Sequence, residues 1–292
     1  MEKLTKVPII GDIPLTGSSK HEESAIAVRE NDNDIMTETF RSLRTNLLFM
    51  MGDPDKKVVL VTSTISGEGK TFIASNLALS LALLGKKVIL VGLDIRKPGL
   101  NKLFHLSHKE KGITQYLAAP KSTDLHALIQ PSGITSNLDL LLGGPIPPNP
   151  TELLARQSLE GTISTLRKEY DYIVLDTAPI GITDTAIIGR VADMCVYVCR
   201  ADVTPKAGFS YINVLRRERK FPKLATVING LDMTKRKNSY GYGYGKKYGY
   251  GKGYGYGYGY GYGYGLDEEE TTTKKGFWGK LCEWTRNKFQ KK

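Results

Sequence analysis

Residues 58–71 read VVLVTSTISGEGKT, and this stretch is the strongest indication of the fold. A run of branched apolar residues, typical of a buried strand, leads into a glycine-rich turn and then into a helix predicted over 72–84. Glycines let backbone N–H groups turn inward around phosphate oxygens, and the helix N-terminus adds a positive partial charge. We therefore predict a nucleoside-triphosphate site here, although Thr64 stands where the common pattern of such loops has its first glycine. The alternative is an ordinary glycine-rich turn ahead of a helix.

The predicted nucleotide-binding residues belong to this turn and to the start of the helix. We expect Lys70 to reach the β and γ phosphates and the Thr71 hydroxyl to bind Mg²⁺. The residues assigned to nucleotide binding in this stretch are Ser66, Gly67, Glu68, Gly69, Lys70, Thr71 and Phe72.

Two further strands end in a carboxylate. Asp94 comes directly after the predicted strand 88–93, and Asp176 comes directly after the predicted strand 173–175. In an open parallel sheet the carboxyl ends of the strands face the ligand crevice, so we expect both side chains near the triphosphate. Asp94 is expected to assist the metal or to accept a proton, and Asp176 to hold Mg²⁺ through water. With Thr71 they are the predicted metal residues. The alternative for either aspartate is a capping or loop residue.

Strands and helices alternate along the rest of the chain. Further short, branched strands are predicted at residues 138–142, 194–199 and 224–228. A helix is predicted to begin at Asn149-Pro150, because asparagine can cap a helix and proline suits its first position. This alternation predicts an α/β fold of the P-loop NTPase type, with a mainly parallel sheet and helices on both faces, over residues 34–232. Residues 1–33, largely polar and charged from residue 16 on, are interpreted as a linker.

Charge is unevenly placed in this chain of 292 residues, whose formal net charge is +11. Residues 1–232 hold 28 basic and 25 acidic residues, whereas residues 233–292 hold 13 and 5. A nearly neutral body with a basic tail argues against a surface that binds nucleic acid, and we expect no nucleic-acid partner. Three cysteines cannot form a disulfide framework in so long a chain, and the longest uncharged apolar stretch, 71–85, is too short to span a membrane. A cytosolic chain, or the cytosolic piece of a larger protein, is expected.

The C-terminal sequence is of low complexity. Residues 240–265 comprise 11 Tyr, 12 Gly and 3 Lys. Tyr-Gly alternation offers no helical face, and the glycines raise the entropic cost of ordering a strand, so we predict a disordered tail over 233–265. Aromatic residues at helical spacing among lysines predict an amphipathic helix, suited to a membrane interface, in 266–292. The alternatives are an aromatic linker and an unstructured basic end.

Several of these motifs together resemble one known family. The GEGKT turn, the segment DIRKP at 94–98, DTAP at 176–179 and the tyrosine cluster resemble the bacterial tyrosine kinases of exopolysaccharide and capsule export. The resemblance covers roughly residues 1–265 and includes GGPIPPNPTELL at 143–154. It implies an ATP- and Mg²⁺-dependent protein-tyrosine kinase that phosphorylates its own C-terminal cluster, between subunits. The implied phosphoacceptors are Tyr240, Tyr242, Tyr244, Tyr248, Tyr250, Tyr254, Tyr256, Tyr258, Tyr260, Tyr262 and Tyr264.

The resemblance also implies partners. Glu38, Arg41 and Arg44, spaced by three along one helix, match a motif with which the family joins subunits into a ring, such as an octamer. The alternative is a solvated, salt-bridged helix face. A membrane-spanning polysaccharide co-polymerase, separate or fused N-terminally, is implied as a partner, with protein tyrosine substrates and a tyrosine phosphatase. This places the chain at the inner face of the plasma membrane, with residues 1–33 as a juxtamembrane-like linker.

Functional residues carry over by position. The implied catalytic residues are Lys70, Asp94, Arg96 and Asp176, and Asn229 matches a position where related P-loop ATPases read adenine.

One position departs from the family pattern. The second motif of the family has an aspartate two residues before Asp94, where this chain has Gly92. A glycine can neither bind a metal nor activate a tyrosine hydroxyl, so one alternative is a catalytically weak scaffold. Another is a partitioning-type ATPase switch, although such proteins carry a signature lysine at the position of Ile65. Phosphoryl transfer depends more on positioning and charge neutralisation than on basicity, so the kinase interpretation remains the leading one.

Overall fold

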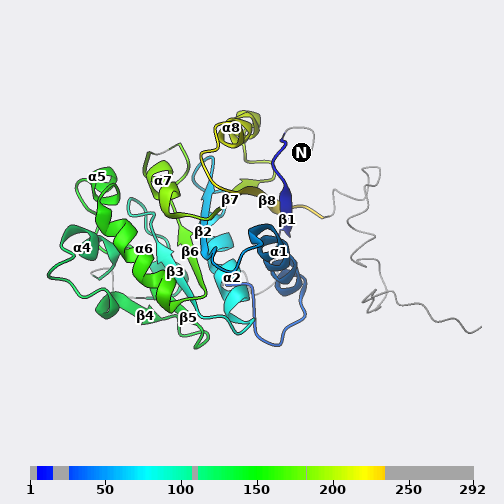
Figure 1. Ribbon diagram of the computed structural model, residues 1–292. Coiled ribbons are helices and arrows are strands. Elements are labelled where there is room, and N and C mark those ends of the chain that lie inside the picture. Colours follow the sequence, from blue (N-terminus) through cyan, green and yellow to red (C-terminus); the bar gives the residue numbers. More distant parts are fainter. Residues whose placement is uncertain (1–4, 16–25, 107–110, 182, 234–292) are drawn as a thin grey trace, which may run out of the picture. The chain divides into compact units, whose positions relative to one another are not determined.

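The protein is described by a computed structural model that covers residues 5–15, 26–106, 111–181 and 183–233. Within these residues lies an eight-stranded sheet with the order β1-β8-β7-β2-β6-β3-β5-β4 (Figure 1). Neighbouring strands run parallel except β4 and β5. The strands are β1 (Ile9–Pro14), β2 (Val58–Ser63), β3 (Val88–Gly92), β4 (Ile129–Pro131), β5 (Leu138–Leu141), β6 (Tyr172–Asp176), β7 (Met194–Arg200) and β8 (Leu224–Leu231).

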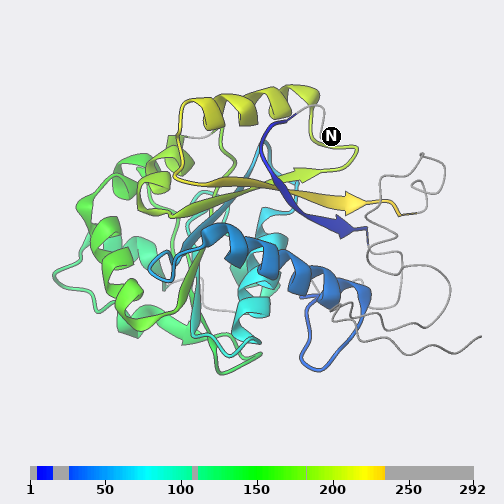
Figure 2. The same cartoon turned by 45° about the vertical axis from the view of Figure 1, so that its right-hand side comes forward.

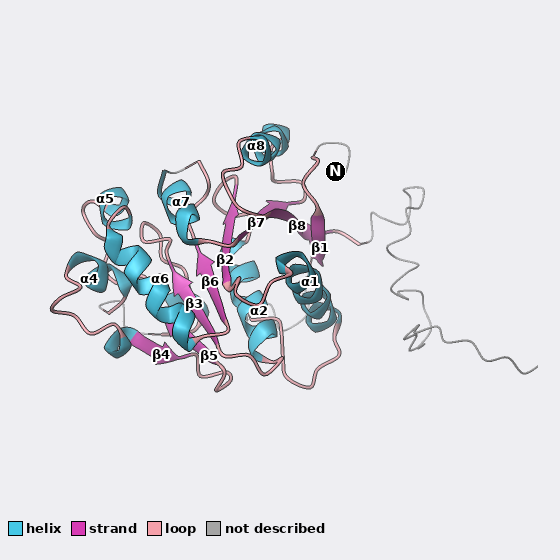
Figure 3. Ribbon diagram, viewed as in Figure 1, coloured by secondary structure: helices cyan, strands magenta, loops and turns pink. Residues whose placement is uncertain are grey.

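Helices cover both faces of the sheet, as Figures 2 and 3 show. The helices are α1 (Ile35–Met51), α2 (Lys70–Ala82), α3 (Leu100–Leu103), α4 (Ile113–Ala118), α5 (Pro150–Leu154), α6 (Gln157–Glu169), α7 (Thr183–Ile188) and α8 (Lys206–Arg217), with 3₁₀ turns η1 (His126–Leu128) and η2 (Gly189–Val191). The predicted α/β fold with a mainly parallel sheet is therefore confirmed.

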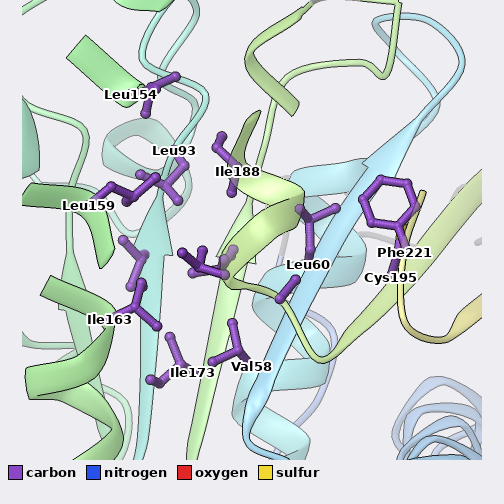
Figure 4. Close-up of a cluster of buried hydrophobic side chains, with 14 of the residues drawn as sticks. Val58, Leu60, Leu93, Leu154, Leu159, Ile163, Ile173, Ile188, Cys195 and Phe221 are labelled. Carbon is purple, nitrogen blue, oxygen red and sulfur yellow. The ribbon is translucent and has the colours of Figure 1, made fainter. Parts of the chain in front are cut away.

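Alternate side chains of the buried strands enter two separate hydrophobic clusters. On β2, Val58 and Leu60 point to the cluster formed with α4–α8, which Figure 4 shows in part. Val59 and Val61 point to the opposite cluster, formed with α1, α2 and α3. Because successive strand residues face opposite sides, a strand with helices on both faces buries every side chain, and all six residues of β2 are buried.

The prediction that residues 1–33 form a linker is wrong for residues 9–14. These residues form β1, which pairs in parallel with β8, and the Ile13 side chain is fully buried. Gly11 lets this strand approach α1 closely, since a Cβ there would lie 2.9 Å from a methyl of Leu43. The sequence signal is weak because glycine and proline interrupt a short strand whose partner lies more than 200 residues away.

A second part of the expected linker also packs on the domain. The N–H groups of Ala27 and Val28 donate to the Asn76 side-chain oxygen on α2, at 2.7 and 3.0 Å. Helix α1 then begins after Asp34, whose carboxylate accepts the N–H of Thr37 at 2.7 Å. The edge strand β4 was not predicted. Asn149 precedes α5, with Pro150 in its first turn, but the expected side-chain cap is not formed.

The predicted tail, residues 233–265, lies outside the described residues apart from Met233, and so do the predicted C-terminal helix in 266–292 and the eleven tyrosines. Among the residues that the structure describes, no helix has the length and apolar character needed to cross a membrane.

Gly112 is a position where the fold excludes any side chain. A Cβ there would overlap the nitrogen of Gly144 and the carbonyl oxygen of Leu142 and would lie 2.7 Å from the carbonyl carbon of Gly143. We expect Gly112→Ala to lower the free energy of unfolding by about 2–4 kcal/mol, because backbone atoms must separate. Urea denaturation measures this change. As a control, Gly161→Ala lies in open space within α6 and should stabilise by about 1 kcal/mol. Equal stability of the two variants would contradict the close approach.

Candidate nucleotide site

Three adjacent parallel strands end at one edge of the sheet. Asp176, the last residue of β6, pairs with Val61 of β2 on one side and with Gly92 of β3 on the other. Beyond β3 the chain folds over the end of β6, because the N–H groups of Leu93 and Asp94 both donate to the Asp176 carbonyl oxygen, at 2.7 and 3.0 Å. Asp94 and Asp176 are thereby brought together, as predicted from the strand ends.

The glycine-rich turn after β2 has the backbone expected of a phosphate-binding loop. Gly67 and Gly69 have φ angles of 89° and 95°, in the left-handed region that favours glycine. Helix α2 begins at Lys70 with Gly69 as its N-cap, so no side chain caps the first turn. Its first N–H groups and the helix dipole are then available to an anion. The Lys70 side chain is 6% exposed at this point.

Asp176 is the electrostatic centre of the site. Its side chain is 1% exposed, and burial raises its pKa to about 7. A hydrogen bond with Thr71 and the charge of Lys70 act in the opposite direction, whereas the charge of Asp94 adds to the rise. Thr71, Lys70 and Asp94 therefore all lie within interaction range of the Asp176 carboxylate.

One oxygen of Asp176, Oδ1, is buried without a hydrogen-bond partner among the described residues. A buried carboxylate oxygen without a partner is costly, and a divalent cation or its bound water would satisfy it. The donor set of a carboxylate and a threonine hydroxyl is the oxygen chemistry that Mg²⁺ prefers. The residues present therefore fit Mg²⁺.

A small hollow beside Asp176 has three glycines among its lining residues. Its lining includes Gly92, Asp94, Gly99 and Gly143. A Cβ added at Gly92 would lie 3.1 Å from the nitrogen of Gly143 and 3.2 Å from a methyl of Leu100. The space beside Gly92 is therefore tight, and a side chain enters it only if these neighbours shift by a few tenths of an ångström.

Arg96 is held by residues that the sequence analysis did not identify. Its guanidinium binds both oxygens of Asp184, at 2.6 and 3.1 Å, and donates to the Thr151 hydroxyl at 2.9 Å. Thr151 in turn donates to Asp184 at 2.7 Å. Asp184 is 1% exposed; burial alone would raise its pKa, but the hydrogen bonds of Arg96 and Thr151 outweigh burial and lower it. No sequence spacing indicates this cluster, since it joins the segment after β3 to the starts of α5 and α7.

Other predicted nucleotide-binding residues have different surroundings. Ser66 is exposed on the loop. The Phe72 ring packs edge-on against Phe40 of α1, with ring centroids 5.8 Å apart, so its side chain belongs to the helix packing. The Asn229 side-chain nitrogen donates to the carbonyl oxygen of Glu68 at 2.9 Å, so this amide contacts the phosphate loop itself.

The predicted oligomer motif lies on α1. Glu38 and Arg41 form an ion pair with each other. Arg44 donates to the Ser80 carbonyl oxygen on α2 at 2.6 Å, and burial lowers its pKa. Arg44 is thus held against α2, whereas Glu38 and Arg41 are paired with each other and remain partly exposed.

The comparisons with known proteins point to one family. Residues 56–212 match a family model described as an AAA domain. The chain is 35% identical to the tyrosine-protein kinase YwqD of Bacillus subtilis, over 76% of this chain and 92% of that protein. It is 31% identical to the putative tyrosine-protein kinase CapB of Staphylococcus aureus, over 74% of this chain and 94% of that protein.

Longer relatives match over a fraction of their length. The tyrosine-protein kinase Etk of Escherichia coli is 33% identical over 59% of this chain, which is 23% of that protein. The solved kinase domain of the Escherichia coli tyrosine kinase Etk superposes with a TM-score of 0.70 at 27% identity, and the match covers 82% of this chain and 95% of that domain.

Proposed function

The chain belongs to the bacterial tyrosine-protein kinases, and we propose that it is an ATP- and Mg²⁺-dependent kinase that phosphorylates the tyrosines of its own C-terminal tail. The observation that carries the proposal is the meeting of Lys70, Thr71, Asp94 and Asp176 at one sheet edge, around a buried carboxylate oxygen that has no hydrogen-bond partner within the described part of the chain.

Each residue of this group has a distinct task. The first turn of α2 and the Lys70 ammonium bind and orient the phosphates of ATP. Thr71 and Asp176 would hold Mg²⁺, which would neutralise charge that develops on the phosphates. Asp94 is half-buried and accepts the proton of the tyrosine hydroxyl. The tyrosine oxygen then forms a bond to the γ-phosphorus of ATP while the bond from that phosphorus to the leaving ADP breaks. Asp176 must be ionised to bind Mg²⁺, so we expect the site to bind the metal at neutral and higher pH.

The tail is the proposed acceptor because its composition suits a cleft. Glycine follows each of the eleven tyrosines and also precedes nine of them, which leaves the neighbouring backbone without bulk. A flexible glycine-rich chain of some two dozen residues spans roughly 25–30 Å, enough to reach the active site of a neighbouring subunit. We propose that Glu38 and Arg41 contribute to the subunit contact.

Phosphorylation would regulate assembly through charge. Each phosphotyrosine adds about −1.5 to −2 at pH 7, so a few of them reverse the positive charge of the tail and repel neighbouring tails. The proposed setting is polysaccharide polymerisation and export at the inner face of the plasma membrane, with a membrane-spanning co-polymerase, protein substrates and a tyrosine phosphatase as partners.

Intact-mass spectrometry tests the kinase. Purified protein incubated with Mg·ATP is expected to gain mass in steps of one phosphoryl group, and peptide mapping should place the groups within residues 240–264. The matched control is the chain in which all eleven tail tyrosines are phenylalanine. ATP hydrolysis without phosphotyrosine would instead indicate an ATPase switch of the partitioning type.

A catalytically weak scaffold is the second candidate, and Gly92 favours it. If the lost carboxylate is the cause, Gly92→Asp should raise tyrosine phosphorylation at least tenfold, provided that the neighbours of Gly92 yield the space. If Asp94 is the proton acceptor, we expect no such gain. A carboxylate at position 92 would in addition be crowded by Gly143 and Leu100. The same mass assay on the two proteins, with the melting temperature of the variant as control, separates these outcomes.

A further inference from the structure

Glu68 carries a buried carboxylate that the proposed chemistry does not use. Glu68 is fully buried, although its loop neighbours Ser66 and Gly67 are exposed. A carboxylate removed from water is costly unless donors replace the water. Glu68 has two such donors: the N–H of Ile65 donates to Oε2 at 2.7 Å, and the Thr204 hydroxyl donates to Oε1. One donor lies in the same loop and the other precedes α8.

The same loop is held at two consecutive carbonyl groups. The guanidinium of Arg200, at the end of β7, donates to the Gly67 oxygen at 2.9 Å, and the amide of Asn229 donates to the Glu68 oxygen at 2.9 Å. The backbone N–H of Arg200 also donates to the Thr204 hydroxyl oxygen at 2.7 Å, which orients that hydroxyl toward Glu68. These contacts come from the two strands that follow β6 in the chain.

The contacts have a consequence for phosphate binding. In a planar trans peptide the N–H points opposite to the C=O. Because the carbonyl groups of Gly67 and Glu68 are turned toward Arg200 and Asn229, the N–H groups of Glu68 and Gly69 are turned away from them and are available to phosphate oxygens. The close approach also explains Gly69, since a Cβ there would overlap the Asn229 amide nitrogen.

We propose that Glu68 and Thr204 are positioning residues that set the shape of the phosphate loop before nucleotide binds, with Asn229 acting on the loop rather than on adenine. This inference rests on the proposed function, in that the loop binds the phosphates of a nucleotide. Preorganisation of a loop raises affinity because the ordering cost is not met at the moment of binding.

The chemistry of the contacts distinguishes conservative from disruptive variants. In Glu68→Gln, the amide oxygen can still accept from Ile65 and the amide nitrogen can donate to the Thr204 oxygen, so both contacts survive without charge. Glu68→Ala removes both acceptors and leaves the Ile65 N–H without its partner. Thr204→Ser keeps the hydroxyl, whereas Thr204→Val removes it at nearly constant volume.

Calorimetric titration of the full chain with Mg·ADP tests the proposal, because ADP excludes phosphorylation. Glu68→Ala is expected to raise the Kd about tenfold to hundredfold and Thr204→Val about fivefold to tenfold, whereas Glu68→Gln and Thr204→Ser should stay within about threefold of the parent chain. The double variant Glu68→Ala/Thr204→Val should bind no more than about twofold more weakly than Glu68→Ala, since both changes break one network. Exposed Glu218 provides the control Glu218→Ala.

Two results would overturn the inference. Unchanged Mg·ADP affinity in folded Glu68→Ala is one, and an equal loss in Glu68→Gln and Glu68→Ala is the other, because the latter would assign the effect to charge and not to hydrogen bonding. If Glu68→Ala does not fold, the comparison of Thr204→Val with Thr204→Ser decides in the same way. Failure of the parent chain to bind Mg·ADP would overturn the proposed function and this inference together, whereas binding without kinase activity would leave the inference standing.

Discussion

Replacement of Lys70 by methionine is expected to lower the rate of tail phosphorylation by about 10³-fold or more while the fold persists. Lys70 is 6% exposed and lies beside Asp176 at the start of α2, where its ammonium would meet the phosphate charge. A preorganised cation or donor that meets developing charge in such a site contributes about 10²–10⁵ in rate. Methionine keeps the length and most of the volume of lysine but carries no charge.

The time course of phosphoryl gain, followed by intact mass, measures this loss. Lys168→Met is the matched control, because Lys168 is exposed in the last turn of α6, away from the strand ends. Circular dichroism should show the same helix content in both variants. A Lys70→Met protein that keeps more than a tenth of the parent rate would show that Lys70 does not contact the transferred phosphoryl group.

Replacement of Asp176 by asparagine is expected to reduce phosphoryl transfer by about 10²–10³-fold. Asparagine has nearly the same shape, so the backbone contacts of Leu93 and Asp94 with residue 176 remain. It removes the negative charge, however, and with it most of the attraction for Mg²⁺ at a buried position. The loss should be partly relieved by raised Mg²⁺ concentration, which separates a metal defect from a folding defect.

The same substitution should change how stability depends on pH. The pKa of Asp176 is raised to about 7 in the folded chain, from an ordinary value of 3.8. Between these values the folded state holds the proton and the unfolded state does not, so the folded state binds more protons and stability falls as pH rises. A rise of about three units corresponds to about 4 kcal/mol lost between pH 4 and pH 7. Asp176→Asn removes this contribution.

Urea denaturation in EDTA, at several pH values between 4 and 8, measures the difference. The free energy of unfolding of the parent chain should decline relative to Asp176→Asn across this window and become parallel above pH 8. Asp55→Asn changes an exposed aspartate and should follow the parent profile. Parallel profiles for parent and Asp176→Asn would mean that the folded-state pKa of Asp176 is ordinary.

The central strands were predicted to within one or two residues, for a physical reason. A strand buried on both faces is a nearly continuous apolar run, and β2, β3, β6 and β7 all have this pattern, with polar residues only at their ends. Such a run is recognisable without its neighbours. The strands that were missed, β1 and β4, lie at the two ends of the sheet and contain proline or glycine, so their strand character comes from a partner and not from their own residues.

The phosphate loop, the two strand-end carboxylates and the parallel α/β fold could be predicted from the sequence, because each depends on residues that are close together in the chain. The distant groups that surround them are known only from the folded structure. The ion pair between Arg96 and Asp184 joins segments 88 residues apart, and the hydrogen bond from Thr204 to Glu68 joins segments 136 residues apart. The burial that raises the pKa of Asp176 depends on the whole packed sheet. Such contacts follow from strand order and burial, which no local spacing encodes.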